Sequence, residues 1–297
     1  MPDDVAAQEV TLGAALRRAT AELGRAGIEG AGNDARRLAS AVLGWSAAHI
    51  LARPEQPLRP AEIHSFDRCI ARRAAREPVS RILGEREFYG RTFAISPATL
   101  DPRADSETLI ELALELVAVE GWQARPLRIL DVGSGSGCLL LTLLAELPQA
   151  FGVGSDVSVA ALQTARANAL RLGLEGRVHW LAGDLLEAVR GPFDVLISNP
   201  PYIPTSHIGG LEPEVRDHDP TLALDGGEDG LYCFRRLLAR APAVVADGWL
   251  VLETGHDQVD QVAALLAAKG VGRGAGTVRV RRDVAGRRRC VAVRTRT

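Results

Sequence analysis

The four residues Asn199-Pro200-Pro201-Tyr202 combine groups that could hold a planar amide or amine. They follow residues 193–198, an apolar run that predicts a buried strand. Proline ends a strand because its ring locks φ and it has no N–H to donate. The Asn199 carboxamide and the Pro200 carbonyl could accept hydrogen bonds from an NH2 group, and Tyr202 offers a ring to stack on it. The alternative is a proline turn that only ends the strand.

A glycine-rich turn is the second feature that could bind a ligand. Residues 128–132 predict a strand, and a helix is predicted from residue 138. The turn between them is Gly133-Ser134-Gly135-Ser136-Gly137. Glycine lets the backbone approach a ligand closely, and the N–H groups of the following helix point into the turn. Its Gly-x-Gly-x-Gly spacing differs from the Gly-x-Gly-x-x-Gly of dinucleotide-binding proteins.

Three acidic residues lie at the ends of neighbouring predicted strands. Asp156 follows the strand at 150–155 and could accept both hydroxyls of a ribose, and Asp184 follows the strand at 177–182 and could reach an adenine amine. Asp131 lies beside the glycine turn, where it could bind the amino end of a zwitterionic ligand. Ligands of open α/β sheets bind at the carboxyl ends of the strands, so we expect one shared site. Each aspartate alone could instead be a cap or turn former.

Helices and strands alternate from about residue 105 onward. The predicted helices are 105–121, 138–147, 158–172, 230–245 and 257–269. The predicted strands are 128–132, 150–155, 177–182, 193–198, 248–253, 277–283 and 288–294. This order predicts an α/β fold with a largely parallel sheet, helices on both faces and one antiparallel strand from the closing hairpin.

The chain is predicted to contain a small helical part and a larger catalytic part. Residues 1–77 show helical spacing without a catalytic constellation, and we expect a substrate-docking bundle there. Its arginine-rich helix, with Arg72 and Arg73 placed away from the apolar stripe, is expected to present a solvated face. Residues 78–104 predict a linker and a β-hairpin, and residues 105–297 the catalytic domain.

Composition excludes several classes of protein. The 297 residues are 46% hydrophobic and 24% charged, which suits one large and one small globular domain. The formal net charge of -2 gives no overall attraction to nucleic acid. The four cysteines and six histidines show no disulfide or metal-ligand spacing. Without a signal peptide or a long apolar run, we expect a cytoplasmic protein with no membrane partner and no metal.

The pattern of residues 105–297 resembles the class I S-adenosylmethionine-dependent methyltransferases. That resemblance implies a Rossmann-like, seven-stranded sheet in which the first and fourth strands flank the ligand site. Asn199 would then face the activated methyl group. Hydrogen bonds from a substrate NH2 to Asn199 and to the Pro200 carbonyl would favour pyramidalisation of an sp2 nitrogen, so that it attacks without a strong base.

Further motifs resemble the HemK/PrmC family of peptide-chain release factor glutamine methyltransferases. They are Tyr89-Gly90-Arg91, residues 100–108, residues 212–215, His218-Asp219-Pro220, Leu252-Glu253-x-Gly255 and Asp283-x-Ala285-Gly286-x-x-Arg289. Three residues depart from the family pattern. Asp101 stands where an aliphatic residue is commoner, Ala104 where a second proline is usual, and Leu185 where some members carry an aromatic residue.

The family resemblance implies a reaction and a set of site residues. The reaction is methyl transfer from S-adenosyl-L-methionine to the glutamine amide in the Gly-Gly-Gln motif of class 1 release factors, with S-adenosyl-L-homocysteine as product. Cofactor contacts are expected from Asp131, Gly133, Ser134, Gly135, Ser136, Gly137, Asp156, Asp184, Leu185 and Asn199. The glutamine would be held by Asn199, Pro200, Pro201 and Tyr202, of which Asn199, Pro200 and Tyr202 would be catalytic. Arg103 and Glu107 either close the pocket or form structural ion pairs.

Two other functions remain open from the sequence. An N6-adenine or other nucleic-acid amino-methyltransferase would use the same clamp but needs a basic, base-reading surface. Only the arginines of the last hairpin could supply such a surface, and we expect them to form a solvated edge that blunts aggregation. A non-catalytic module could also keep a methyltransferase fold, although the intact glycines, acids and residues 199–202 disfavour it.

Overall fold

The computed structural model describes residues 10–268 and 278–295 and separates into two compact units, Met1–Gly84 and Glu85–Thr297. The last residue of the helix predicted at 257–269 and the first of the strand predicted at 277–283 lie outside the described residues, as does the start of the bundle predicted at 1–77. Within the described ranges, no helix is long and apolar enough to span a membrane.

The first unit is a bundle of helices around an apolar core. The helices are α1 (Leu12–Arg25), α2 (Ala31–Leu43), α3 (Ala47–Ala52), α4 (Pro60–Ala74) and α5 (Val79–Leu83). Side chains at helical spacing, such as Leu12 and Leu23 on α1, are fully buried against Phe66 and Ile70 of α4. The helical character predicted for this region is therefore observed.

The prediction that the linker begins at residue 78 is wrong. Pro78 caps helix α5, and Val79 packs into the core of the first unit with 7% of its surface exposed. Gly84 ends the helix with a φ of 73°, a left-handed conformation that suits glycine. The apolar side chains of α5 thus extend the first unit to Gly84, and the hairpin of β1 (Glu85–Phe88) and β2 (Arg91–Ala94) begins directly afterwards.

Arg73 contradicts the expected solvated face of helix α4. Only 9% of its side chain is exposed, and its Nε donates to the Asp34 carboxylate of α2 at 2.8 Å. The neighbouring Arg72 is 47% exposed and pairs with Glu77 near the end of the helix. Arg73 can be buried because a carboxylate on the facing helix offsets its charge, which the sequence of α4 alone does not reveal.

The second unit is built on a seven-stranded sheet with the strand order β5-β4-β3-β6-β7-β9-β8. Its strands are β3 (Arg128–Val132), β4 (Phe151–Asp156), β5 (Val178–Ala182), β6 (Val195–Ser198), β7 (Trp249–Glu253), β8 (Arg279–Arg282) and β9 (Arg288–Arg294). The strands from β5 to β7 pair in parallel, and β9 runs antiparallel to both of its neighbours. The predicted α/β sheet with one antiparallel strand is confirmed.

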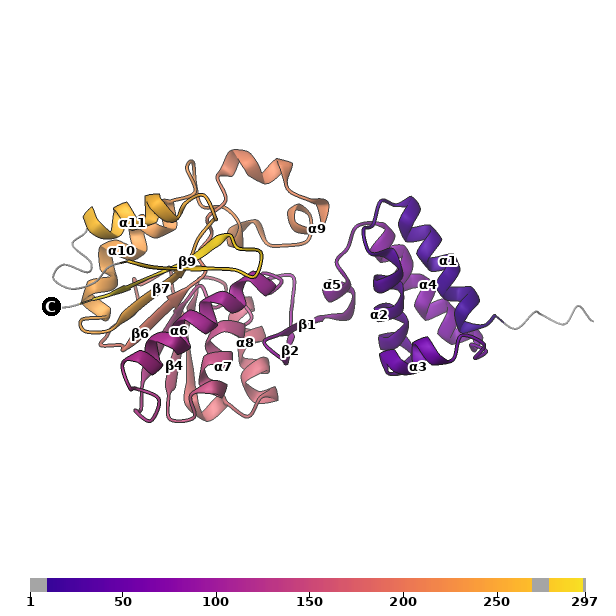
Figure 1. Ribbon diagram of the computed structural model, residues 1–297, viewed down its shortest axis with the longest axis horizontal. Coiled ribbons are helices and arrows are strands. Elements are labelled where there is room, and N and C mark those ends of the chain that lie inside the picture. The colour runs from indigo at the N-terminus through magenta and orange to yellow at the C-terminus, as the bar shows by residue number, and fades with distance from the viewer. Residues whose placement is uncertain (1–9, 269–277, 296–297) are drawn as a thin grey trace, which may run out of the picture. The chain divides into compact units, whose positions relative to one another are not determined.

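Helices cover both faces of this sheet (Figure 1). One face carries α6 (Glu107–Val119), α7 (Cys138–Glu146) and α8 (Val159–Arg171), and the other carries α10 (Tyr232–Val244) and α11 (Val259–Ala268). Successive strand residues point to opposite faces, so Ile129 of β3 packs with α6 and α7 while Leu130 packs with α10 and α11. The shorter segments are η1 (Ala104–Ser106), η2 (Glu175–Arg177), η3 (Thr205–Gly210), α9 (Pro213–Arg216) and η4 (Thr221–Ala223).

The strands β3 and β6 are direct neighbours in the sheet, although helices α7 and α8 and strands β4 and β5 lie between them in the sequence. Asp131 of β3 pairs in register with Ile197 of β6. The glycine turn leaves the carboxyl end of β3, and residues 199–202 leave the carboxyl end of β6. The sheet therefore brings the two sequence motifs together at its topological switch point, where open α/β sheets bind ligands.

Arg73→Ala should destabilise the first unit, whereas Arg72→Ala should have little effect. The first change leaves the Asp34 carboxylate, 19% exposed, without its cation, and breaking such a buried pair costs about 3 kcal/mol. The more exposed pair of Arg72 and Glu77 contributes at most about 1 kcal/mol. Hydrogen exchange of α2 and α4 in the full chain measures the difference, and equal protection in both variants would contradict the buried-pair interpretation.

Candidate active site

A cavity of about 480 Å3 opens at the carboxyl ends of the central strands. The predicted site residues that line it are Arg103, Gly133, Ser134, Gly135, Ser136, Asp156, Asp184, Leu185, Asn199 and Pro201. Among the described residues, the predicted site residues outside its lining are Glu107, Asp131, Gly137, Pro200 and Tyr202. The fold thus gathers most of the residues that the sequence analysis selected around one cavity.

Glycine is required in this turn for two different structural reasons. Gly133 and Gly135 take φ values of 78° and 55°, and a Cβ built on either meets no atom within 4 Å. They leave open space beside the backbone, as a ligand cradle requires. A Cβ on Gly137 would lie 2.8 Å from Cη2 of Trp180, so this glycine lets the start of α7 pack against β5. Only the first two are suited by geometry to approach a ligand.

Asp156 is fixed at the cavity by the turn that it faces. Its Oδ2 accepts the Gly135 N–H at 2.8 Å, and its Oδ1 accepts the Ser158 N–H at the same distance. Each carboxylate oxygen has a second lone pair for a further donor. The carboxylate therefore orders the glycine turn and can still accept hydroxyl groups of a ligand.

Asp131 lies fully buried directly behind the turn. Neither carboxylate oxygen has a hydrogen-bond partner, because the Ser134 hydroxyl donates instead to the Asp131 backbone carbonyl at 3.1 Å. Burial is the main cause that raises the pKa of Asp131 to about 7, and the charge of Asp156 adds to it. A cationic group placed in the neighbouring cavity would offset this burial. The orphaned carboxylate and the open glycine cradle together fit a ligand that joins an amino group to a nucleoside.

The far wall of the cavity carries an ion pair that the sequence analysis missed. Asp184 accepts a hydrogen bond from Nη1 of Arg236 at 2.7 Å, and Arg236 also pairs with Glu187 at 2.5 Å. Arg236 belongs to α10, far from Asp184 in the sequence, so no local pattern could predict the pair. Next to it, Leu185 takes a φ of 48°, an unusual value for a residue with a Cβ.

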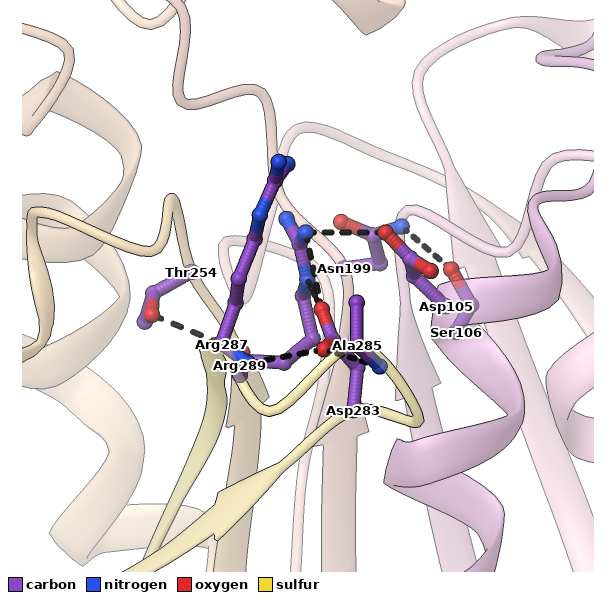
Figure 2. Close-up of polar contacts among 8 residues, drawn as sticks. All are labelled: Asp105, Ser106, Asn199, Thr254, Asp283, Ala285, Arg287 and Arg289. Carbon is purple, nitrogen blue, oxygen red and sulfur yellow. Dashed lines mark hydrogen bonds and ion pairs between the residues drawn. The ribbon is translucent and has the colours of Figure 1, made fainter.

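Asn199 enters the cavity with its carboxamide oriented by one hydrogen bond. Its Nδ2 donates to Ser106 Oγ at 3.3 Å, as Figure 2 shows, which leaves Oδ1 free for a donor in the cavity. Ser106 is buried and also lines the cavity. It lies within residues 100–108, which the family resemblance singled out, yet only the fold places it beside Asn199.

Tyr202 does not form the flat cavity wall expected for it. Its ring packs against the core between the sheet and α10, and its carbonyl accepts from Gln258 Nε2 at 2.9 Å. Burial holds the pKa of its hydroxyl well above the usual range. At the cavity mouth, the structure places Leu222 and Tyr232 instead, with 62% and 53% of their surfaces exposed. Tyr202 thus supports the turn rather than the wall.

Arg103 and Glu107 differ in their position relative to the cavity. Arg103 lines the cavity and forms an ion pair with Asp219, whose side chain is only 1% exposed. Glu107 lies outside the cavity lining, and its Oε1 accepts the Tyr89 N–H of the β1–β2 hairpin at 2.9 Å. Of the two, only Arg103 is placed to contact a ligand.

The comparisons with known proteins agree with this geometry. Residues 14–84 match the family model of the PrmC N-terminal domain, and residues 111–209 match that of the methyltransferase small domain. Among solved structures, the catalytic domain of hMettl16, in complex with the MAT2A 3'UTR hairpin 6, has a TM-score of 0.56 and 16% sequence identity. The matched region covers 76% of this chain and 81% of the hMettl16 chain, and at this identity the similarity shows the fold alone.

Two curated relatives cover most of the chain. The release factor glutamine methyltransferase of Rhodospirillum rubrum is 44% identical over 296 residues, which are 99% of this chain and 88% of that protein. The protein of the same name from Bradyrhizobium diazoefficiens is 48% identical over 255 residues, 86% of this chain and 86% of that protein. The predicted family is confirmed, and the chain belongs to the release factor glutamine methyltransferases.

Proposed function

We propose that this chain transfers a methyl group from S-adenosyl-L-methionine to the glutamine side-chain amide in the Gly-Gly-Gln motif of class 1 release factors. The observation that carries the proposal is the shared cavity of the glycine cradle and Asn199, with Oδ1 of Asn199 free to accept. Because release factors act in translation, we place the reaction in the cytoplasm.

The carboxyl ends of β3, β4 and β5 would bind the cofactor. When bound, S-adenosyl-L-methionine supplies a methyl group made electrophilic by its sulfonium. Gly133 and Gly135 would let the backbone approach it, and Asp156 would accept from its ribose hydroxyls. Asp131 would stabilise its amino group through charge, and Asp184 with Leu185 would border the base.

Asn199 would orient the glutamine amide for attack. An amide nitrogen is a weak nucleophile because its lone pair is delocalised into the carbonyl. Donation of its two N–H bonds to Oδ1 of Asn199 and to the Pro200 carbonyl would favour the pyramidal nitrogen that forms during transfer. The chain then contributes positioning and electrostatic stabilisation, and Pro201 would help to shape the pocket.

The first unit would recognise the release factor. All lining residues of the cavity among the described part of the chain lie between Ala98 and Arg236, so the first unit supplies none of them. An appended bundle that takes no part in the cavity can contribute binding energy remote from the reacting groups. We therefore assign substrate docking to residues 1–84.

The charges of the last hairpin disfavour nucleic acid as the substrate. Arg281 pairs with Glu111 and Glu115, and Arg288 pairs with Asp260. The expectation of a simply solvated edge is therefore incomplete, because carboxylates of neighbouring helices offset these cations. A hairpin neutralised in part in this way offers less attraction to phosphates.

Asn199→Ala should lower kcat by ~10²–10³-fold, the usual loss for one preorganised hydrogen-bonding group that acts in the transition state. Mass spectrometry of purified release factor after incubation with S-adenosyl-L-methionine measures methylation of the glutamine. Calorimetry should find cofactor affinity little changed. Wild-type methylation by this variant, or no methylation by the wild type, would refute the proposed reaction.

Deletion of residues 1–84 should leave cofactor affinity intact and sharply lower kcat/KM for intact release factor. The reason is that binding energy from the first unit no longer positions the glutamine. A short peptide that carries the Gly-Gly-Gln motif serves as the control, because both proteins should methylate it equally. Equal activity of both proteins on intact release factor would show that the first unit does not dock the substrate.

Gly135→Ala and Gly137→Ala should separate cofactor binding from packing. Both place a side chain at positive φ, which costs about 1–2 kcal/mol. Gly137→Ala also collides with Trp180 and should lower Tm further, since overpacking typically costs about 1–3 kcal/mol. Gly135→Ala should show the greater loss of cofactor affinity relative to its change in Tm. Unchanged cofactor affinity in Gly135→Ala would remove this turn from the proposed site.

A further inference from the structure

Helix α8, which lies beside the β1–β2 hairpin (Figure 1), carries a fully buried carboxamide. It belongs to Asn168, which is 0% exposed and lies behind the cavity, outside its lining. A carboxamide has two N–H donors and an accepting oxygen, and burying it is costly unless these groups find partners. The partners of Asn168 therefore show which segments it holds.

The Asn168 carboxamide makes two hydrogen bonds to the end of the hairpin. Its Oδ1 accepts the backbone N–H of Ala94 at 2.7 Å, and its Nδ2 donates to the carbonyl of the same residue at 2.9 Å. Ala94 is the last residue of β2. Because a backbone N–H can only donate and a carbonyl can only accept, these two bonds fix which end of the carboxamide is the oxygen. Helix α8 thus holds the end of β2 in one position.

The same carboxamide also reaches the glycine turn. Nδ2 of Asn168 donates to the carbonyl of Ser136 at 2.9 Å, and Ser136 is buried and lines the cavity. The Ser136 carbonyl and the Gly137 N–H belong to one planar peptide group. That N–H donates to the Ser134 carbonyl at 2.8 Å. The peptide that closes the turn is therefore held on one side by Asn168 and on the other by the turn itself.

The chain that leaves the hairpin runs into the wall of the cavity. Within residues 98–103, the lining residues are Ala98, Leu100, Pro102 and Arg103. This segment begins only a few residues after the end of β2, so the bonds that fix β2 also restrain where the segment starts. One buried side chain therefore contacts both the glycine turn and the strand that leads into residues 98–103 of the cavity wall.

We propose that Asn168 is a positioning residue for the cofactor, which fixes the Ser136 peptide of the glycine turn and couples this turn to the end of β2. The inference rests on the proposed cofactor site. A ligand that orders the glycine turn then also orders Ala94, because the two share one carboxamide. Loss of the carboxamide weakens cofactor binding although no group that lines the cavity is removed.

Asn168→Ala tests the positioning role by calorimetry with S-adenosyl-L-homocysteine. We expect its affinity to fall about 10-fold, as is typical when the partner that orients a ligand-binding group is lost. The KM for S-adenosyl-L-methionine should rise in parallel, while kcat at saturating cofactor stays near the wild-type value. A change that only lowered stability would leave the affinity of the folded molecules unchanged. Wild-type affinity in a folded Asn168→Ala protein would overturn the proposal.

Thr164→Val is the matched control. Thr164 precedes Asn168 by one turn of α8 and lies on the same face of the helix. Its hydroxyl lies 2.9 Å from Ser96 Oγ and 3.3 Å from the Ala160 carbonyl, and neither partner belongs to the glycine turn. Valine keeps the shape and removes the hydroxyl, so cofactor affinity should not change. An equal loss in both variants would show that affinity depends on the contact of α8 with the hairpin side and not on Ser136.

Hydrogen exchange followed by NMR tests the coupling in the wild-type protein. S-adenosyl-L-homocysteine should slow exchange of the Gly137 N–H in the turn and also of the Ala94 N–H, which Asn168 accepts outside the cavity. In Asn168→Ala, and in Asn168→Asp, which when ionised has no donor for Ser136, the slowing at Ala94 should be lost. If neither variant folds, the wild type alone decides: exchange at Ala94 that the ligand does not change would contradict the coupling.

The same measurements separate this inference from the proposed function. If the wild-type protein does not bind S-adenosyl-L-homocysteine, the proposed cofactor site itself fails. If the wild type binds it and Asn168→Ala binds it equally well, the cofactor site stands and only the positioning role of Asn168 fails. Weaker binding by Asn168→Ala, with Thr164→Val like the wild type and ligand-dependent exchange at Ala94, supports both.

Discussion

The parallel pairing of β3 with β6 is the constraint on which the site depends. It sets Asp131 beside Ile197, so the glycine turn after one strand and Asn199 after the other leave the sheet at the same edge. The segments that follow these two strands both line the cavity at this edge of the sheet. Each motif is only a few residues long, so the two could not line the same cavity without this register.

Buried charge is handled differently in the two halves of the site. On the side of the glycine turn, Asp131 is left without a partner, which suits a site completed by a cationic ligand. On the side of Asn199, the buried Arg289 is paired with Asp105 and Asp283. An unpaired buried charge is costly, so the first arrangement favours binding and the second favours a fixed geometry.

The boundary between the two compact units falls after Gly84, and the division of work that we propose follows this boundary. Helix α5 belongs to the first unit because its apolar face completes that core, and the second unit starts with the hairpin that Glu107 holds through the Tyr89 N–H. The cavity draws its described lining from the second unit alone. Recognition and chemistry can therefore be proposed as separate properties, each of which has its own test.

The sequence by itself determined the order of helices and strands, the glycine turn, the place of Asn199 after a buried strand and the family, because local and periodic patterns carry them. Tertiary structure decided which residues meet. Ser106 beside Asn199, Arg236 beside Asp184, and Arg289 beside Asp105 each join segments that are distant in the chain. It also removed Tyr202 from the cavity wall and buried Arg73. The physical reason is that side-chain partners and burial depend on the packing of whole elements, whereas strand and turn signals depend on neighbouring residues.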